Sequence, residues 1–343
     1  MRGSSHNGFY QPNNTYNKLT SELNKLKVRN FNPGELTIFG NNQIGQGSRS
    51  SVFEAKINQS GEKIAAKTLD VFGRNRRTAK KPDDLLYYID IFNSINHANI
   101  LKFIGVSFDS NTFYELTEIC DFDLEKFSHN YFFQGQQSFP DATYKKILTD
   151  TCEGMSYLHG AGVLHRDLKA DNILLKRAAD GVSWIAKVAD FGLAKRVGSD
   201  KKVPRGPVKL NPPEALLCIC SGCRVENNQD PISLHLSNLQ IGTSSSTSVS
   251  NHRSQGCQHI YPFYTQSDVY MFGVMVYCIS HKRDFFGRER TGQIAEKVKF
   301  GQRPVFDQRR VSNQLIKIIS DCWEQDYTKR PSFENISLLI NSF

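Results

Sequence analysis

The sequence lacks any apolar run approaching the ~20 residues that a membrane-spanning helix needs. The stretch from Met1 to Tyr16 is polar and lacks the apolar core of a signal peptide. We therefore expect no membrane span and a cytoplasmic location.

A disulfide framework is also missing. The eight cysteines are spaced irregularly, and several lie inside apolar runs, which suits a reducing compartment. Cys220-x-x-Cys223 and Cys257-x-His259 have the residue types of a zinc site, although the second pair is tighter than in a usual finger. Because the polar, low-complexity run Gly242–Ser248 separates them, we prefer a flexible loop with incidental cysteines and keep zinc as the alternative.

Concentrated charge is scarce, although the chain carries 43 Lys and Arg against 34 Asp and Glu, a formal net charge of +9. The basic residues are scattered, and the one dense cluster runs from Arg74 to Lys81. This distribution does not favour DNA binding, and the excess positive charge favours acidic or phosphorylated partners.

The chain of 343 residues, 39% of them hydrophobic, is long enough to bury a sizeable core. Residues 1–33 are rich in Asn, Ser and Tyr and predict a flexible leader, in which Leu19, Leu23 and Leu26 have the spacing of one amphipathic helix.

Short strand patterns follow the leader, and Gly-bearing turns separate the first of them. They predict an antiparallel sheet from strands at 35–38, 51–55, 63–69 and 113–120. A long helix is then expected from Ala142 to His159, ending at Gly160.

The stretch from Val163 to Gly192 carries the densest chemistry. Asp167, Lys169 and Asn172 lie within six residues between two apolar anchors. A loop of this kind can aim a carboxylate at a hydroxyl nucleophile while Lys169 and Asn172 face phosphate and metal. Asp190, before a Phe-Gly pair, supplies a second metal-binding carboxylate.

A glycine pair and a lysine add phosphate-binding chemistry earlier in the chain. Gly45 and Gly47 lie between the first two predicted strands, where they let backbone amides approach phosphate oxygens closely. Lys67 lies on the third of the predicted strands. A Gly-x-Gly pair alone is weak evidence, but the lysine at this spacing strengthens it.

In this order, the motifs resemble those of the catalytic domain of eukaryotic protein kinases, in the tyrosine-kinase or tyrosine-kinase-like group. The match includes the His-Arg-Asp-Leu-x-x-x-Asn and Asp-Phe-Gly signatures. Thr265–Val274 resembles the helix whose Asp braces the catalytic loop, and Cys322–Phe333 resembles the closing segment whose Arg pairs with a glutamate, here Glu214.

The resemblance implies an α+β, bilobal fold. Its N-lobe, with an antiparallel sheet and one main helix, would cover 34–120, and its mostly helical C-lobe 121–343. About 218–263 would form an inserted polar loop.

The resemblance also implies the activity, which is transfer of the ATP γ-phosphoryl group to a protein hydroxyl. Asp167 would accept the hydroxyl proton, Lys169 would neutralise developing charge, and Asn172 and Asp190 would hold Mg²⁺. Lys67 would hold the α and β phosphates. The implied nucleotide-binding set is Ile44, Gly45, Gly47, Val52, Ala65, Lys67, Thr117, Glu118, Cys120 and Leu174. A stack joining the lobes would contain Phe92, Phe103, His165 and Phe191.

The sequence departs from the family at the acid partner of the lysine. Kinases pair this lysine with a glutamate on the following helix, but there is no Glu between Lys67 and His97. The glutamate position falls on Tyr88, with Asp84 one turn earlier on the same face. Ser50 also replaces the third loop glycine. Substitution by Asp84 and a pseudokinase that binds ATP or acts as a scaffold both stay open.

The acceptor residue is the second open question. Lys169 is typical of Ser/Thr kinases and their tyrosine-kinase-like relatives, whereas Pro207–Leu216 resembles the substrate-docking segment of tyrosine kinases. We favour tyrosine slightly. A small-molecule phosphotransferase is disfavoured because such enzymes lack the Asp-Phe-Gly and Pro-Glu segments.

Overall fold

The structure is a computed structural model, and it divides the chain into two compact units. The described residues are 12–47, 50–71, 81–108, 112–133, 141–199, 208–216 and 263–342. The first unit comprises Met1–Gln134, Ala142–His165 and Ala170–Val203; the second comprises Gly135–Asp141, Arg166–Lys169 and Pro204–Phe343. Within the described ranges, no helix is long and apolar enough to cross a membrane.

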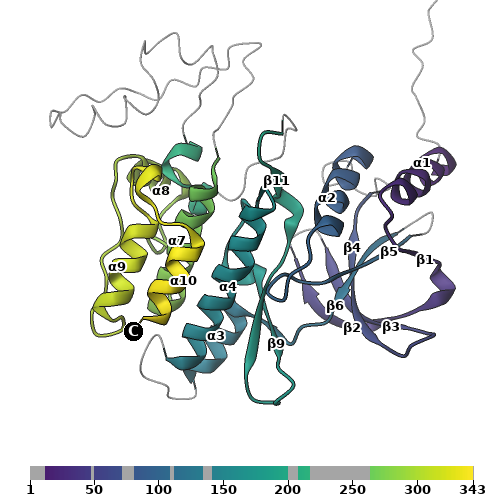
Figure 1. The fold of residues 1–343 in the computed structure, drawn as a ribbon, viewed down its shortest axis with the longest axis horizontal. Helices are drawn as coiled ribbons and strands as arrows, with labels where there is room; N and C mark the ends of the chain where they lie inside the picture. The colour runs from purple at the N-terminus through teal and green to yellow at the C-terminus, as the bar shows by residue number, and fades with distance from the viewer. Residues whose placement is uncertain are drawn as a thin grey trace, which may run out of the picture. The chain divides into compact units, whose positions relative to one another are not determined.

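A six-stranded sheet dominates the first unit (Figure 1). Its strands, in spatial order, are β1 (Asn30–Phe31), β5 (Phe103–Phe108), β6 (Phe113–Glu118), β4 (Lys63–Leu69), β3 (Ser51–Ile57) and β2 (Leu36–Gln46). All neighbours pair antiparallel except β1 and β5, which pair parallel. The predicted antiparallel sheet is confirmed.

The two faces of this sheet carry different chemistry because successive side chains of a strand point to opposite faces. Ile64 and Ala66 of β4 and Leu116 of β6 belong to a buried apolar cluster. Lys67 therefore lies on the other face, where the strand register sets it opposite Glu115. The alternation of β4 positions the lysine without any loop.

Helix α2 (Pro82–Ser94) lies between β4 and β5 in the sequence and is the predicted main helix. Pro82 stands in its first turn with Asp83 and Asp84, where a missing N–H is tolerated and negative charge is favourable. Its buried residues include Tyr88 and Phe92.

The prediction of a flexible leader over residues 1–33 is wrong for its described part. Helix α1 (Pro12–Lys25) packs with α2, and Leu19 and Leu23 are completely buried, which confirms the predicted amphipathic helix. Beyond α1, β1 adds a strand beside β5, and the Val106 N–H donates to the Arg29 carbonyl at 2.9 Å. The composition suggested disorder because the surface that buries these leucines comes from elsewhere in the chain.

Glycine is required at position 105 for this arrangement. Gly105 has φ +155°, and a Cβ there would lie 2.3 Å from the Arg29 carbonyl oxygen. Any other residue would push the β1 segment away from β5.

The rest of the first unit supports the candidate site. A three-stranded antiparallel sheet has the order β10 (Trp184–Val188), β9 (Ile173–Arg177), β7 (Phe122–Asp123), and β8 (Val163–Leu164) pairs with β11 (Lys195–Arg196). The helices are α3 (Leu124–Phe133) and α4 (Ala142–Gly160), with 3₁₀ turns η2 (Ala170–Asn172) and η3 (Phe191–Leu193). The predicted helix ending at Gly160 is confirmed.

The second unit is helical (Figure 1). Its elements are η4 (Val208–Leu210), η5 (Pro213–Leu216), α7 (Thr265–His281), α8 (Thr291–Lys299), α9 (Asn313–Cys322), η6 (Tyr327–Lys329) and α10 (Phe333–Asn341). Gly273 of α7 lets α9 approach closely, since a Cβ there would lie 2.8 Å from the Cys322 Cβ. Helix α7 is almost wholly buried, as expected for a central helix.

The α+β, bilobal fold is thus confirmed, whereas the lobe boundaries at 34–120 and 121–343 stay predictions. The insertion at about 218–263, with its cysteines and histidines, lies outside the described residues except for its last residue. The zinc alternative therefore stays a prediction.

We expect Leu23→Ala to lower the free energy of unfolding by about 2–5 kcal/mol, because it removes a buried side chain and leaves a cavity between α1 and its neighbours. Urea denaturation measures the change. Lys25→Ala, on the same helix but exposed and paired with Glu22, is the control and should shift stability by less than ~1 kcal/mol. Equal midpoints for the two variants would show that α1 is not part of the folded core.

Candidate active site

The catalytic loop contributes Asp167 and Lys169 to the second unit. Lys169 Nζ lies 3.8 Å from Asp167 Oδ2. The backbone N–H of Arg166 donates to Asp268 Oδ1 of α7 at 2.7 Å, and Asp268 is fully buried. This bond holds Arg166 in its left-handed conformation, φ +71°, just before Asp167. The predicted bracing aspartate is confirmed.

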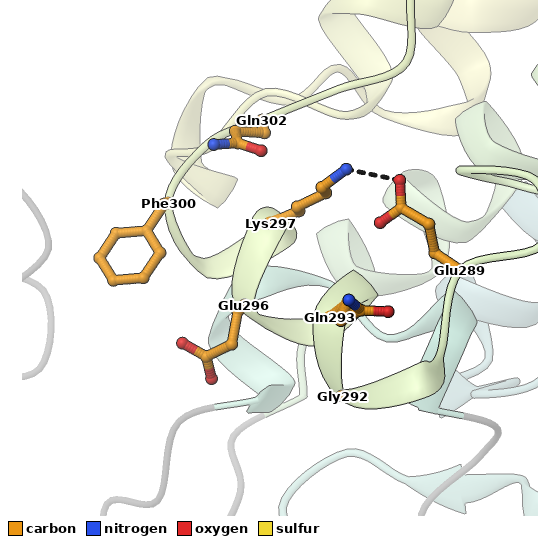
Figure 2. A pocket seen from close by; sticks show the side chains of 7 residues that line it. All are labelled: Glu289, Gly292, Gln293, Glu296, Lys297, Phe300 and Gln302. Carbon is orange, nitrogen blue, oxygen red and sulfur yellow. Dashed lines mark hydrogen bonds and ion pairs between the residues drawn. The ribbon is translucent and has the colours of Figure 1, made fainter. Parts of the chain in front are cut away.

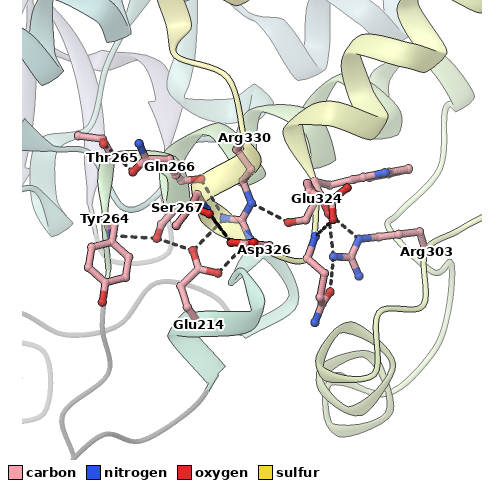
Figure 3. Close-up of polar contacts among 12 residues, drawn as sticks. Glu214, Tyr264, Thr265, Gln266, Ser267, Arg303, Glu324, Asp326 and Arg330 are labelled. Carbon is pink, nitrogen blue, oxygen red and sulfur yellow. Dashed lines mark hydrogen bonds and ion pairs between the residues drawn. The ribbon is translucent and has the colours of Figure 1, made fainter. Parts of the chain in front are cut away.

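A buried ion pair ties η5 to the segment before α10 (Figure 3). Arg330 Nη1 and Nη2 donate to Glu214 Oε1 and Oε2 at 2.8 and 3.0 Å, a bidentate geometry. Ser267 donates to the same carboxylate at 2.7 Å, and Arg330 also donates to the Gln266 and Glu324 carbonyls. The predicted Glu214–Arg330 pair is confirmed.

Asn172 and Asp190, the predicted metal ligands, lie at the ends of neighbouring strands of the first unit. The β9–β10 pairing ends at Ile173 and Val188, and the Ala189 N–H then donates to the Asn172 carbonyl at 2.9 Å. Asp190 has φ +60° and accepts the Gly192 N–H at 3.3 Å. The strand register therefore places the backbones of the two predicted metal ligands near each other.

Lys67 of β4 meets Asp190 in the same unit, with 3.3 Å between Nζ and Oδ1. Burial acts to lower the pKa of Lys67, but the negative charges of Asp190 and Glu115 outweigh it and hold the pKa above its ordinary value. Lys67 is thus a fixed ammonium group at physiological pH.

Tyr88 of α2 occupies the position at which the family carries its glutamate, and its hydroxyl donates to Glu115 Oε2. Both residues are buried, at 4% and 3% exposure. Burial, and then the charges of Glu115 and Asp190, raise the pKa of Tyr88, which keeps the phenol neutral. Asp84 is exposed in the first turn of α2. The second carboxylate that raises the Lys67 pKa is Glu115, not Asp84.

Glu115 was not among the residues predicted from the sequence. A signal was present, because it stands two residues before Thr117 on a strand and therefore shares its face. Only the register between β4 and β6 identifies Lys67 as its neighbour.

Most of the predicted nucleotide-binding residues lie on strands of the main sheet. Val52 is opposite Lys67, and Ala65 is opposite Thr117. Ala65 and Thr117 are buried, whereas Ile44 on β2 is 39% exposed. Leu174 lies in the three-stranded sheet, opposite Asp123 of β7.

The two loop glycines lie at the β2–β3 turn. Gly45 pairs with Val52, and a Cβ at Gly45 would lie 3.4 Å from the Val52 Cβ. The Gly47 N–H donates to the Ser50 carbonyl at 2.8 Å. The tip, residues 48–49, lies outside the described residues.

The connector after β6 is anchored by Glu118. Its carboxylate lies 2.7 Å from Lys176 Nζ and 2.9 Å from Lys187 Nζ, on β9 and β10. Burial raises the pKa of Glu118, but hydrogen bonds from the two lysines outweigh it and keep the pKa below its ordinary value. At Cys120, burial and the Glu118 charge raise the pKa of the thiol to about 12.

Four aromatic rings form a continuous row within the first unit. Phe92 lies 4.9 Å from Phe103 and 5.0 Å from Phe191, and Phe191 lies 5.4 Å from His165, measured between ring centroids. The predicted stack is confirmed. His165 is fixed further by a 2.9 Å hydrogen bond between its Nε2 and the Ala189 carbonyl.

Two protein-family models match consecutive parts of the chain. "Protein kinase domain" covers residues 40–246, and "Protein tyrosine and serine/threonine kinase" covers residues 249–340. The chain belongs to the protein kinase domain family.

Curated kinases align with it at moderate identity. The human "Dual specificity testis-specific protein kinase 2" is 34% identical over 180 residues, 51% of this chain and 29% of that protein. The "Probable serine/threonine-protein kinase roco7" of Dictyostelium discoideum is 27% identical over 329 residues, 93% of this chain and 10% of that protein. The chain thus matches less than a third of the length of either relative.

The kinase chain also has a pocket of ≈ 710 Å³ in its second unit (Figure 2). It is lined by Glu289, Gly292, Gln293, Glu296, Lys297, Phe300 and Gln302, and Lys297 is ion-paired with Glu289. None of these residues belongs to the predicted site.

We expect Arg330→Gln to lower the free energy of unfolding by about 3–5 kcal/mol, because it leaves the Glu214 carboxylate buried without its ion pair. Lys317→Gln is the control, since it breaks an exposed pair with Asp321 and should cost less than ~1 kcal/mol. Chemical denaturation of both variants gives the comparison. A loss for Arg330→Gln no larger than for Lys317→Gln would contradict a stabilising role for the buried pair.

Proposed function

We propose that this chain is an ATP-dependent protein kinase that transfers the γ-phosphoryl group of ATP to a hydroxyl of a protein substrate. The observation that carries the proposal is the Lys67–Asp190 pair at 3.3 Å, beside Asn172 at the ends of β9 and β10. A phosphate-binding lysine and the metal-binding residues are the parts that phosphoryl transfer requires of the protein.

The proposed roles follow the chemistry of each side chain. Asp167 orients the acceptor hydroxyl and accepts its proton, and Lys169 neutralises charge that develops on the transferred group. Lys67 holds the α and β phosphates. The adenine lies among Ile44, Val52, Ala65 and Leu174, close to the backbone of Glu118 and Cys120 and with Thr117 behind it. Gly45 and Gly47 offer backbone amides to the phosphates.

The residues present fit Mg²⁺. One carboxylate and one amide oxygen are few ligands for a metal held by protein alone, but Mg²⁺ is commonly bound by one or two protein oxygens with substrate phosphates and waters. Among the described residues there is no group of three or more His, Cys, Asp or Glu side chains that would suit another metal. When bound, Mg²⁺ neutralises charge on the phosphate oxygens.

Two features point to different acceptor residues. The Pro207–Leu216 segment supports the tyrosine preference, whereas Lys169 and the names of the relatives, which include serine/threonine and dual-specificity kinases, support Ser and Thr. We propose that the acceptor is a protein hydroxyl of either class and keep tyrosine preference as a prediction.

A pseudokinase that binds ATP or serves as a scaffold is the second candidate. Tyr88 in place of the helix glutamate is the observation that favours it. Cytoplasmic location and acidic or phosphorylated partners remain expectations from composition.

Asp167→Asn separates the two candidates. For an active kinase, we expect phosphoryl transfer to fall by about 10²–10⁴-fold, because the base is lost, while nucleotide affinity stays nearly unchanged. Turnover of ATP with a protein substrate and nucleotide titration measure the two effects. Asp321→Asn, an exposed carboxylate on α9, is the control. Equal rates for Asp167→Asn and the unmodified chain would exclude the kinase and leave the pseudokinase.

The acceptor class is tested with a peptide array that presents Tyr, Ser and Thr in matched contexts. If the Pro207–Leu216 segment sets specificity, we expect tyrosine peptides to gain more phosphate. Labelling confined to Ser and Thr would overturn the tyrosine preference without affecting the proposal of kinase activity.

A further inference from the structure

We propose that Glu115 is the positioning carboxylate for Lys67, and that Tyr88 of α2 adds a supporting hydrogen bond to it. The acid partner of the phosphate-binding lysine has thereby moved from the helix to the sheet. This inference rests on the proposed function, because it assigns the partner of the lysine that holds the ATP phosphates.

The strand register provides the geometry. Lys67 of β4 and Glu115 of β6 are directly opposite in an antiparallel pair, so their side chains share one face with Cβ atoms about 4.5–5.5 Å apart. The next pair on this face is Ala65 and Thr117. The carboxylate therefore lies beside the lysine on the same face of the sheet as two predicted nucleotide-binding residues.

Because Glu115 is buried, its carboxylate requires neighbouring groups that compensate its charge. At 3% exposure a carboxylate is costly unless neighbouring groups compensate it. A phenol hydrogen bond comes from Tyr88, and the Lys67 ammonium lies close enough for the two charges to interact. Replacing Tyr88 or Lys67 should therefore change the environment of the Glu115 carboxylate.

Asp190 cannot serve as the permanent partner of Lys67 in a kinase. Its side chain is 43% exposed, and it is the proposed metal ligand. Glu115 is buried on a strand and is not a proposed metal ligand, so it can remain beside Lys67 while Asp190 serves the metal.

The same geometry explains why the helix has no glutamate at position 88. A carboxylate there would lie against the carboxylate of Glu115, and two like charges in one buried place cannot both ionise without a large penalty. A neutral phenol supplies a hydrogen bond and no charge. A carboxylate at position 115 on β6 therefore goes together with a neutral residue in place of glutamate at position 88 on α2.

With the carboxylate on β6, the position of Lys67 depends on a strand of the sheet instead of on helix α2. Strand β6 lies inside the sheet, bonded to β4 on one side and to β5 on the other. A shift of α2 would break the Tyr88 hydrogen bond and leave Glu115 beside Lys67. Lysine positioning should consequently depend strongly on Glu115 and weakly on Tyr88.

The test uses the full chain and measures affinity for MgADP by calorimetry, kcat and KM for ATP, and the melting temperature. We expect Glu115→Gln to weaken MgADP binding by about tenfold or more, in line with the loss of a charged contact, and Tyr88→Phe to change it only about two- to threefold. Glu22→Gln, an exposed carboxylate of the same unit, is the matched control.

Two further variants separate positioning from mere stability. Because the proposed effect acts through the lysine, Glu115→Gln should cost no additional MgADP affinity in a Lys67→Met background. Tyr88→Glu alone should impair binding, whereas Tyr88→Glu combined with Glu115→Gln, which returns the carboxylate to the helix, should recover most of it. Additive losses, or a double variant no better than Glu115→Gln, would overturn the inference.

If Glu115→Gln melts below the assay temperature, the double variant Tyr88→Glu with Glu115→Gln becomes the sole test of the inference. Recovery of melting temperature and MgADP affinity supports the inference, and any other result overturns it. MgADP binding without phosphoryl transfer in the unmodified chain would refute kinase activity. The MgADP affinities of the variants would still test whether Glu115 positions Lys67.

Discussion

The half-buried ammonium of Lys67 is the constraint on which the candidate site depends. A positive charge in this position is stable only where carboxylates surround it, and the first unit supplies Asp190 from the end of β10 and Glu115 from β6. The alternation of side chains along β4 decides that the ammonium faces these acids while Ile64 and Ala66 face the apolar cluster. Neighbouring residues of β4 thus point to opposite faces of the sheet, one face carrying the charged groups and the other the apolar cluster.

The same principle governs the second unit. Asp268 braces the backbone at Arg166, and Glu214 receives both arms of the Arg330 guanidinium. Each of these acids is buried, and each is compensated by directional donors rather than by solvent. Removing one partner of such a pair is costly, because the charge that remains is buried without compensation.

Much of the site was predictable because its motifs are local. The spacing within the catalytic loop is a short signature, and the family resemblance that such signatures carry implies the aromatic row from Phe92 to His165 and the Glu214–Arg330 pair. Glu115 was not, since its relation to Lys67 exists only through the pairing of β4 with β6, which no short window of sequence contains. The leader was misjudged for a similar reason, because Leu19 and Leu23 are buried by residues far along the chain.

Cys120 lies in the connector that the adenine is proposed to contact, a location that invites the design of cysteine-directed inhibitors. Burial and the neighbouring Glu118 charge raise the pKa of this thiol to about 12, so its thiolate is scarce at neutral pH. Electrophiles that rely on a thiolate would therefore find little to react with at this position. Selectivity for this kinase is better sought in the shape and charge around Glu115 and Tyr88, because Tyr88 stands where the family resemblance implies a glutamate.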